Sequence, residues 1–238
     1  MKQPLLICAV VALVGCGKKY DGNTGVINPN KPSPKAVPVN IAEPIVEKAI
    51  RKSLKKPTGE LTKADLEKVT KLYLKYNQLT EVPKDLEKLN QLTHLILSYN
   101  QLTDVTGLEK LTKLKWLSLK SNQLTEIPKG LENLTKLKWL FVDFNQLADV
   151  QGLEKLPQLT GLFLDFNQLT ELPKGLEKLT NLEGLYLANN RLTEVTGLEK
   201  LSQLEELSVE SNFDLTKTQI DELQKALPKC EIHSNPTK

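Results

Sequence analysis

The sequence predicts an α/β repeat solenoid, in which short copies of one motif stack side by side and share a parallel β-sheet. Asparagines recur at a nearly constant interval, which alternates between two lengths that differ by a single position. Each lies in the frame L-x-L-x-x-N-x-L or a close variant of it, and the alternating leucines have the period of a strand with one buried face. The repeated asparagines are Asn77, Asn100, Asn122, Asn145, Asn167, Asn190 and Asn212. No single copy can bury its leucines alone, so the copies must stack.

Each copy predicts one short strand, a turn and a return segment. In the first copy Leu72 and Leu74 point into the core, whereas Tyr73 between them points outward. A second set of leucines, which includes Leu86 and Leu89, closes the core from the opposite side. We expect the repeated asparagines to bond to backbone groups at the turns as a buried ladder, and not to bind a ligand.

Two kinds of copy alternate, so the full unit is about 45 residues long. The longer copies contain a proline–lysine pair such as Pro83-Lys84, and the shorter copies contain a glycine such as Gly107. Over residues 72–212 this frame resembles the leucine-rich-repeat family, as a mixture of typical and SDS22-like copies, and the glycine-containing copies resemble the bacterial internalin type. The resemblance implies about seven leucine-rich repeats in a horseshoe, with the parallel β-sheet on the concave face.

Residues 41–71 predict a helical N-terminal cap, because a stacked array must cover its exposed end. Apolar residues recur at helical spacing from Ile45 to Leu54. Thr62 is a suitable N-cap for a second, short helix. A helical cap before the repeats also resembles the one in internalin-like proteins.

Residues 213–238 predict a C-terminal cap and tail. An amphipathic helix is expected from Thr216 to Leu227, followed by a possible last strand. Cys230 begins that strand, and we expect it to be a buried cap residue and not a reactive thiol.

Residues 1–15 predict a secretory signal peptide. Lys2 precedes an apolar run from Pro4 to Val14, which is too short to cross a bilayer as a helix. The run leads into Cys16 through Leu-Val-Gly, which resembles the lipobox of bacterial lipoproteins and implies a lipid-modified Cys16 at the start of the mature chain. The alternative is an ordinary signal peptide followed by an incidental cysteine.

Residues 16–40 predict a lipidated flexible linker, because they are rich in glycine, asparagine and proline and lack apolar periodicity. Lipid on Cys16 would then tether the repeats to a membrane of the bacterial cell envelope. Gly17 stands where an aspartate would resemble an inner-membrane retention signal, which favours the outer membrane.

Aromatic residues on the outer face of the sheet indicate where a ligand would bind. Ten of the twelve aromatic residues fall at outward positions, although the leucine core does not need them. Large exposed apolar patches often mark binding sites, whereas the alternative is that aromatics simply suit a parallel sheet. The predicted ligand-binding residues are Tyr73, Trp116, Trp139, Phe141, Asp143, Phe163, Asp165 and Tyr186.

Charge on the same face changes sign along the array, from Lys71 and Lys75 at one end to Glu210 at the other. A partner is expected to carry the opposite polarity, unless these charges are only solvated. Asp143 and Asp165 should be neighbours on the sheet. They could act as paired carboxylates or form a weak calcium site. Their position beside open solvent favours a binding role over catalysis.

Catalysis, metal binding and cofactors are not indicated. The chain has two histidines and none of the nucleotide-binding, hydrolase or metalloprotease motifs, and its acidic body argues against nucleic acid. We expect a monomeric, non-enzymatic module that binds a protein partner. Binding of a glycan or cell-wall polymer by the same face is the alternative, because aromatic faces stack on sugar rings, and a purely structural envelope protein is a weaker third hypothesis.

Overall fold

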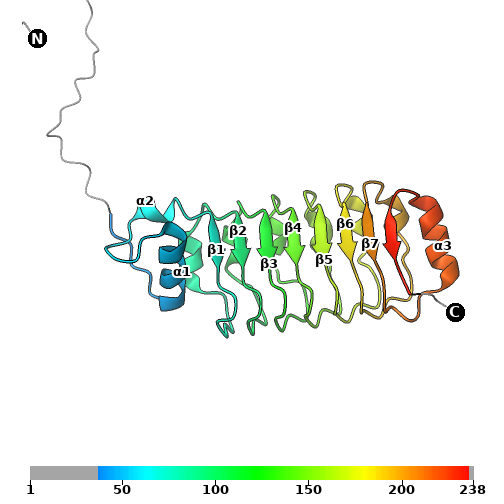
Figure 1. Cartoon of the computed structure of the whole chain (residues 1–238), viewed down its shortest axis with the longest axis horizontal. Coiled ribbons are helices and arrows are strands. Elements are labelled where there is room, and N and C mark those ends of the chain that lie inside the picture. Colours follow the sequence, from blue (N-terminus) through cyan, green and yellow to red (C-terminus); the bar gives the residue numbers. More distant parts are fainter. Residues whose placement is uncertain (1–36, 236–238) are drawn as a thin grey trace, which may run out of the picture. The chain divides into compact units, whose positions relative to one another are not determined.

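The computed structural model describes residues 37–235, which form the predicted solenoid. Eight parallel strands make one sheet in the order β1 to β8, so each strand lies beside the next one in the sequence (Figure 1). The strands are β1 Lys71–Tyr73, β2 His94–Ile96, β3 Trp116–Ser118, β4 Trp139–Phe141, β5 Gly161–Phe163, β6 Gly184–Tyr186, β7 Glu206–Ser208 and β8 Glu231–His233. The predicted signal peptide, Cys16 and most of the predicted linker lie outside the described residues. Within residues 37–235, no helix is both long and apolar enough to span a membrane.

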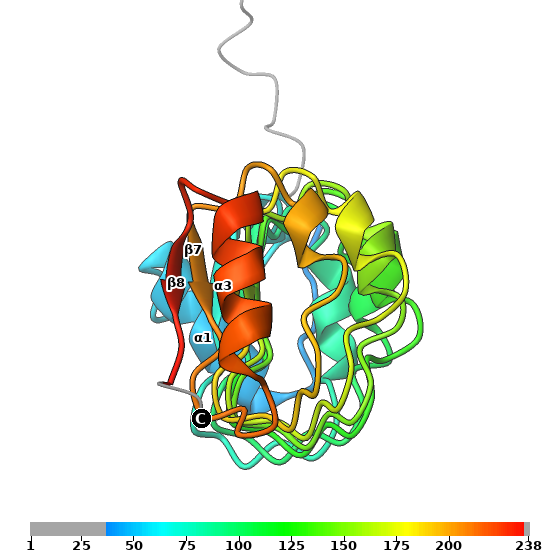
Figure 2. The ribbon, with the colours of Figure 1, turned by 90° about the vertical axis from the view of Figure 1, so that its right-hand side faces the viewer.

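The register of the sheet aligns equivalent positions of successive copies. Leu95 pairs with Leu117, and Leu117 with Leu140, and all three side chains are fully buried. Short 3-10 helices lie across the core from the sheet, as the view along the array shows (Figure 2). They are η1 Lys84–Lys88, η2 Leu108–Lys110, η3 Leu131–Asn133, η4 Leu153–Lys155, η5 Leu176–Lys178 and η6 Leu198–Lys200. Each fully buried leucine contributes about 1.5–3 kcal/mol, so the leucine core is the main source of stability.

The repeated asparagines form the predicted buried ladder. Nδ2 of Asn145 donates to the carbonyls of Leu119 at 3.1 Å and Val142 at 3.0 Å, and its Oδ1 accepts from the amide of Leu124 at 3.0 Å. One side chain therefore joins two adjacent copies at the turn. Asn77 differs because no copy precedes it, and its Nδ2 donates only to the carbonyl of Lys75.

The N-terminal cap is helical, as predicted. Helix α1, Pro44–Leu54, buries Val46 and Ile50 against the first copy. Helix α2, Lys63–Leu66, begins at a capping box in which Thr62 accepts from the amide of Asp65. Hydrogen bonds to the first copy hold the cap in place.

Asp85 joins the cap to the first repeat. It is 4% exposed, and its Oδ2 accepts from the amide of Glu43 at 2.9 Å. Glu43 in turn accepts from the amide of Lys84 at 3.0 Å. The later copies of this type have glycine at the same position, so the aspartate is specific to the copy that meets the cap.

The C-terminal cap consists of helix α3, Lys217–Ala226, and strand β8. Thr216 caps α3 by accepting from the amide of Gln219, and Leu223 faces the core. Cys230 is 4% exposed, and burial raises the pKa of its thiol. It is therefore a buried cap residue, as predicted.

Candidate functional site

Five aromatic side chains form one continuous strip across β3 to β6. We call Trp116, Trp139, Phe141, Phe163 and Tyr186 the aromatic strip. Ring centroids lie 4.8 Å apart for Trp116 and Phe141, 4.2 Å for Phe141 and Phe163, and 4.3 Å for Phe163 and Tyr186. Trp139 lies 5.6 Å from Trp116 and 6.3 Å from Phe163. All five rings are half-buried, so the predicted aromatic centre is a contiguous surface.

Two glycines explain how the strip lies against the sheet. A Cβ on Gly161 would meet Cε3 of Trp139 at 2.2 Å, so the indole occupies the space of the missing side chain. A Cβ on Gly184 would meet the ring of Tyr186 at 3.2 Å. The Tyr186 hydroxyl donates to Glu206 at 2.6 Å, which fixes the end of the strip. Burial and this carboxylate raise the pKa of Tyr186 to about 12.

Tyr73 lies apart from the strip. Its ring is 61% exposed on β1, and its partner in the register is Ile96, followed by Ser118. Ser118 is buried and its hydroxyl bonds to that of Ser98 at 2.6 Å, so the column of rings is interrupted there. Of the predicted aromatic residues, Tyr73 is the one that the structure does not join to the others.

A second row of aromatics lies where the strands end, and we call Tyr76, Tyr99, Phe144 and Phe166 the aromatic ridge. Tyr76 and Tyr99 stack at 4.5 Å, and Phe144 and Phe166 at 4.2 Å. Their exposed fractions run from 41% to 64%, so they are more exposed than the strip. The predicted ligand-binding residues do not include these four, although all four are at outward positions of the sequence pattern.

The ridge residues have an unusual backbone. All four have φ between 54° and 61°, in the left-handed region, as does Asn189 at the equivalent place in a later copy. An aromatic residue in this conformation costs about 1–2 kcal/mol, whereas asparagine adopts it more easily. The sequence signal that locates the ridge is the position directly before each ladder asparagine.

A charged cluster lies between the strip and the ridge. Nζ of Lys120 lies 2.6 Å from Oδ2 of Asp143, which is 4% exposed and therefore not a free surface group. The Oδ1 atom of Asp143 is buried without a partner among the described residues. Asp165 accepts from the amide of Ala188 at 2.7 Å. Burial raises the pKa of Asp165 to about 6, with the charge of Asp143 acting in the same direction and the Ala188 amide opposing it.

The two carboxylates of the cluster have different surroundings. Across residues 37–235, no group of three metal-ligating side chains converges. Asp143 and Asp165 interact as the sequence predicts, but the ammonium group of Lys120 already holds the first of them. The remaining negative charge is on Asp165.

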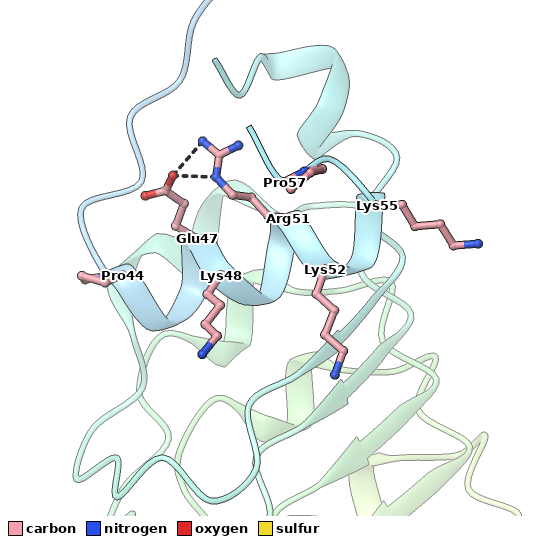
Figure 3. Close-up of a pocket in the computed structure, with 7 residues that line it drawn as sticks. All are labelled: Pro44, Glu47, Lys48, Arg51, Lys52, Lys55 and Pro57. Carbon is pink, nitrogen blue, oxygen red and sulfur yellow. Dashed lines mark hydrogen bonds and ion pairs between the residues drawn. The ribbon is translucent and has the colours of Figure 1, made fainter. Parts of the chain in front are cut away.

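The N-terminal cap has a separate, basic surface. A hollow over α1 is lined by Pro44, Glu47, Lys48, Arg51, Lys52, Lys55 and Pro57 (Figure 3). Its one carboxylate, Glu47, pairs with Arg51 at 2.8 Å, and Lys48, Lys52 and Lys55 are exposed. No aromatic ring lines it, so we place the candidate ligand site on the sheet.

The stacked leucine frames, the parallel sheet and the asparagine ladder define a leucine-rich-repeat protein. A family profile described as a leucine-rich repeat region matches residues 98–233, and one described as two copies of the leucine-rich repeat matches residues 67–110. The chain belongs to the leucine-rich-repeat family, whose domains commonly mediate protein–protein interaction.

The chain is similar to many solved structures, including one from Listeria and one from Leptospira. Internalin C2 of Listeria monocytogenes shares 30% sequence identity with a TM-score of 0.74, over 83% of this chain and 86% of internalin C2. A leucine-rich-repeat protein of Leptospira interrogans shares 32% identity with a TM-score of 0.63, over 71% of this chain and 49% of the other. This chain therefore spans about half the length of the Leptospira protein. No curated protein matches at a significant level.

Proposed function

We propose that the chain is a non-enzymatic, membrane-tethered module of the bacterial cell envelope that binds a protein partner through the aromatic strip. The observation that carries this proposal is the continuous series of ring contacts among five half-buried aromatic side chains over four consecutive strands. Aromatic side chains are enriched among the residues that dominate protein interfaces. The core beneath is complete without them, because it is made of fully buried leucines.

Charge at the two ends of the sheet supports a macromolecular partner. Lys71 at the start of β1 and Lys75 just after it are exposed, and so is Glu210 beyond β7, on the other side of the strip. Such a gradient orients a partner of opposite polarity and speeds its association. A partner that meets both the strip and the charges must span several strands.

Glycan binding is the alternative, and the position of Trp139 favours it. The indole lies across Gly161 with no side chain beneath it, which is a suitable platform for a sugar ring. Binding to purified envelope polysaccharides would distinguish the two functions, since a glycan ligand should bind without any protein.

The tether is proposed from residues 1–40. Supporting features are the predicted signal peptide, the lipobox-like sequence before Cys16 and the exposed lysines of α1, which follow the linker directly. Labelling cells with an alkyne-tagged fatty acid should modify the chain, and Cys16→Ser should abolish the label. Export without any label in the unsubstituted chain would instead indicate an ordinary signal peptide.

Site-specific cross-linking tests the protein-binding function. A photoreactive amino acid at position 99, which is 41% exposed in the aromatic ridge, should capture a defined partner in cells. The double variant Trp139→Ala/Phe163→Ala should then reduce capture at least about tenfold, as expected for central interface aromatics. The matched control is Phe213→Ala, which removes an 83% exposed ring that belongs to neither the strip nor the ridge. Circular dichroism must show that the double variant is folded, and unchanged capture by it would exclude the strip.

A further inference from the structure

We infer that Asp165 and Phe166 receive a cationic side chain, lysine or arginine, from the protein partner. This inference rests on the proposed function and specifies the chemistry of the partner at one point. It comes from a comparison of two adjacent copies of the repeat.

One copy already contains such a site, filled by the chain's own lysine. Nζ of Lys120 lies 2.6 Å from Oδ2 of Asp143 and 4.7 Å from the centre of the Phe144 ring. The ammonium group thus satisfies a carboxylate and a cation–π contact together. The lysine comes from one copy, and the carboxylate and ring come from the next.

The following copy repeats the carboxylate and the ring without the cation. Asp165 and Phe166 occupy the positions of Asp143 and Phe144 one strand later, and the two phenylalanine rings stack at 4.2 Å. The position equivalent to Lys120 is then Asp143 itself. Among the described residues, no lysine, arginine or histidine nitrogen lies within ion-pair distance of Asp165.

The residues around Asp165 and Phe166 leave this second site open to solvent and negatively charged. Phe166 is 45% exposed and Asp165 is half-buried, and the next position along the sheet is the short side chain of Ala188. The Oδ1 atom of buried Asp143, which lacks a partner among the described residues, adds negative potential from the other side. One lysine and two aspartates give the cluster a net charge of −1 when all are ionised.

Lysine and arginine side chains fit these features better than a metal ion. A planar guanidinium or a methylene-linked ammonium can stack on Phe166 while its N–H groups donate to Asp165. A divalent cation would need more oxygen ligands than Asp165 and the already paired Asp143 can supply.

Small model compounds test the site by NMR. N-acetyl-lysine methylamide and N-acetyl-arginine methylamide should shift the Phe166 ring resonances and lower the pKa of Asp165 from about 6. The uncharged analogue N-acetyl-norleucine methylamide should do neither. Asp165→Asn should abolish the shifts, and Phe166→Leu should weaken them. Equal shifts with the norleucine compound, or shifts that survive in Asp165→Asn, would overturn the inference, as would a larger response to calcium chloride alone.

The filled copy provides a matched control. Lys120→Met removes the ammonium group from the site formed by Asp143 and Phe144. The lysine compound should then also shift the Phe144 ring resonances, whereas the norleucine compound should not. The titratable groups near Asp165 are Asp143, Lys120 and Tyr186, and only Lys120 is altered in this experiment. Tyr186 stays neutral, because its pKa is about 12. If Lys120→Met is unfolded, the inference is tested only by comparing the resonance shifts of the parent with those of Asp165→Asn.

Partner binding separates this inference from the proposed function. Once cross-linking at position 99 has identified the partner, Asp165→Asn in the otherwise unmodified chain should weaken affinity about tenfold at pH 7.5 and less at pH 5, where Asp165 is protonated. Loss of binding in Trp139→Ala/Phe163→Ala together with an unchanged affinity in Asp165→Asn would refute the cation site and leave the function standing. If the strip variant binds normally, the proposed function itself is wrong.

Discussion

The indole of Trp139 fills the space above Gly161 on the neighbouring strand, where a Cβ atom would lie 2.2 Å from the ring. A Cβ this close to a rigid ring cannot be accommodated without moving it. The strip therefore depends on a residue that has no side chain of its own.

Gly161→Ala should displace Trp139 and disrupt the strip without removing any aromatic residue. We expect a shifted tryptophan emission spectrum, a stability loss of about 1–3 kcal/mol and weaker partner binding. Gly184→Ala is the matched control, because its Cβ would meet Tyr186 at 3.2 Å and requires only a small movement. An unchanged emission spectrum in Gly161→Ala would contradict the packing of Trp139 described above.

Asn145→Ala should be among the most destabilising single substitutions in the array. It would leave buried carbonyls of Leu119 and Val142 and the amide of Leu124 unbonded, at about 1–3 kcal/mol for each group. Urea unfolding measures the loss. Asn77→Ala, at the start of the ladder, should cost less than about 1 kcal/mol, because the side chain makes a single exposed hydrogen bond.

Asp165 should make stability fall as pH rises from about 4 to about 6. Its pKa is raised to about 6 in the folded chain and is 3.8 without the fold, so between these values the folded state binds more protons. The contribution is present below pH 4 and is lost as Asp165 ionises. Urea midpoints at pH 4.5 and 7.5 should therefore differ less in Asp165→Asn than in the parent, whereas exposed Asp214→Asn should behave as the parent.

Tyr186 should ionise later than an ordinary tyrosine. Burial and the Glu206 carboxylate raise its pKa to about 12. When the pH is raised, the increase in phenolate absorbance that comes from Tyr186 should therefore be the last of the tyrosine transitions. Subtracting the titration of Tyr186→Phe from that of the parent isolates this phase. Glu206→Gln should move it to lower pH, and a Tyr186 transition near pH 10 would contradict the hydrogen bond.

The repeat pattern predicted most of the fold, because each leucine has a single favourable environment. Side chains alternate between the two faces of a strand, so Leu117 and Leu140 must both face the core. A stacked array must also be capped at its end, and this requirement supports the prediction of a helix after Thr216. The aromatic strip was predictable for the same reason. Its residues alternate with core leucines in consecutive copies.

The repeat pattern could not predict which side chains on the outer face are covered by their neighbours and therefore buried. Asp143 has an outward position but is buried, because Lys120 from the preceding copy covers it. Ser118 is also outward in the pattern and buried in the structure. The ridge residues share a left-handed backbone at the position before each ladder asparagine, but the frame alone does not give their exposed fractions.

The place of the aromatic strip within the array affects how the protein can move. The strip occupies β3 to β6, so at least two strands separate it from each edge of the eight-stranded sheet. Stacked arrays fray from their ends, because each copy is held only by its neighbours. Amide hydrogens in α1 and α3 should thus exchange before those of β4, while the strip keeps its shape. A partner would meet a rigid platform and lose little conformational entropy on this side of the complex, even while the ends of the solenoid open and close.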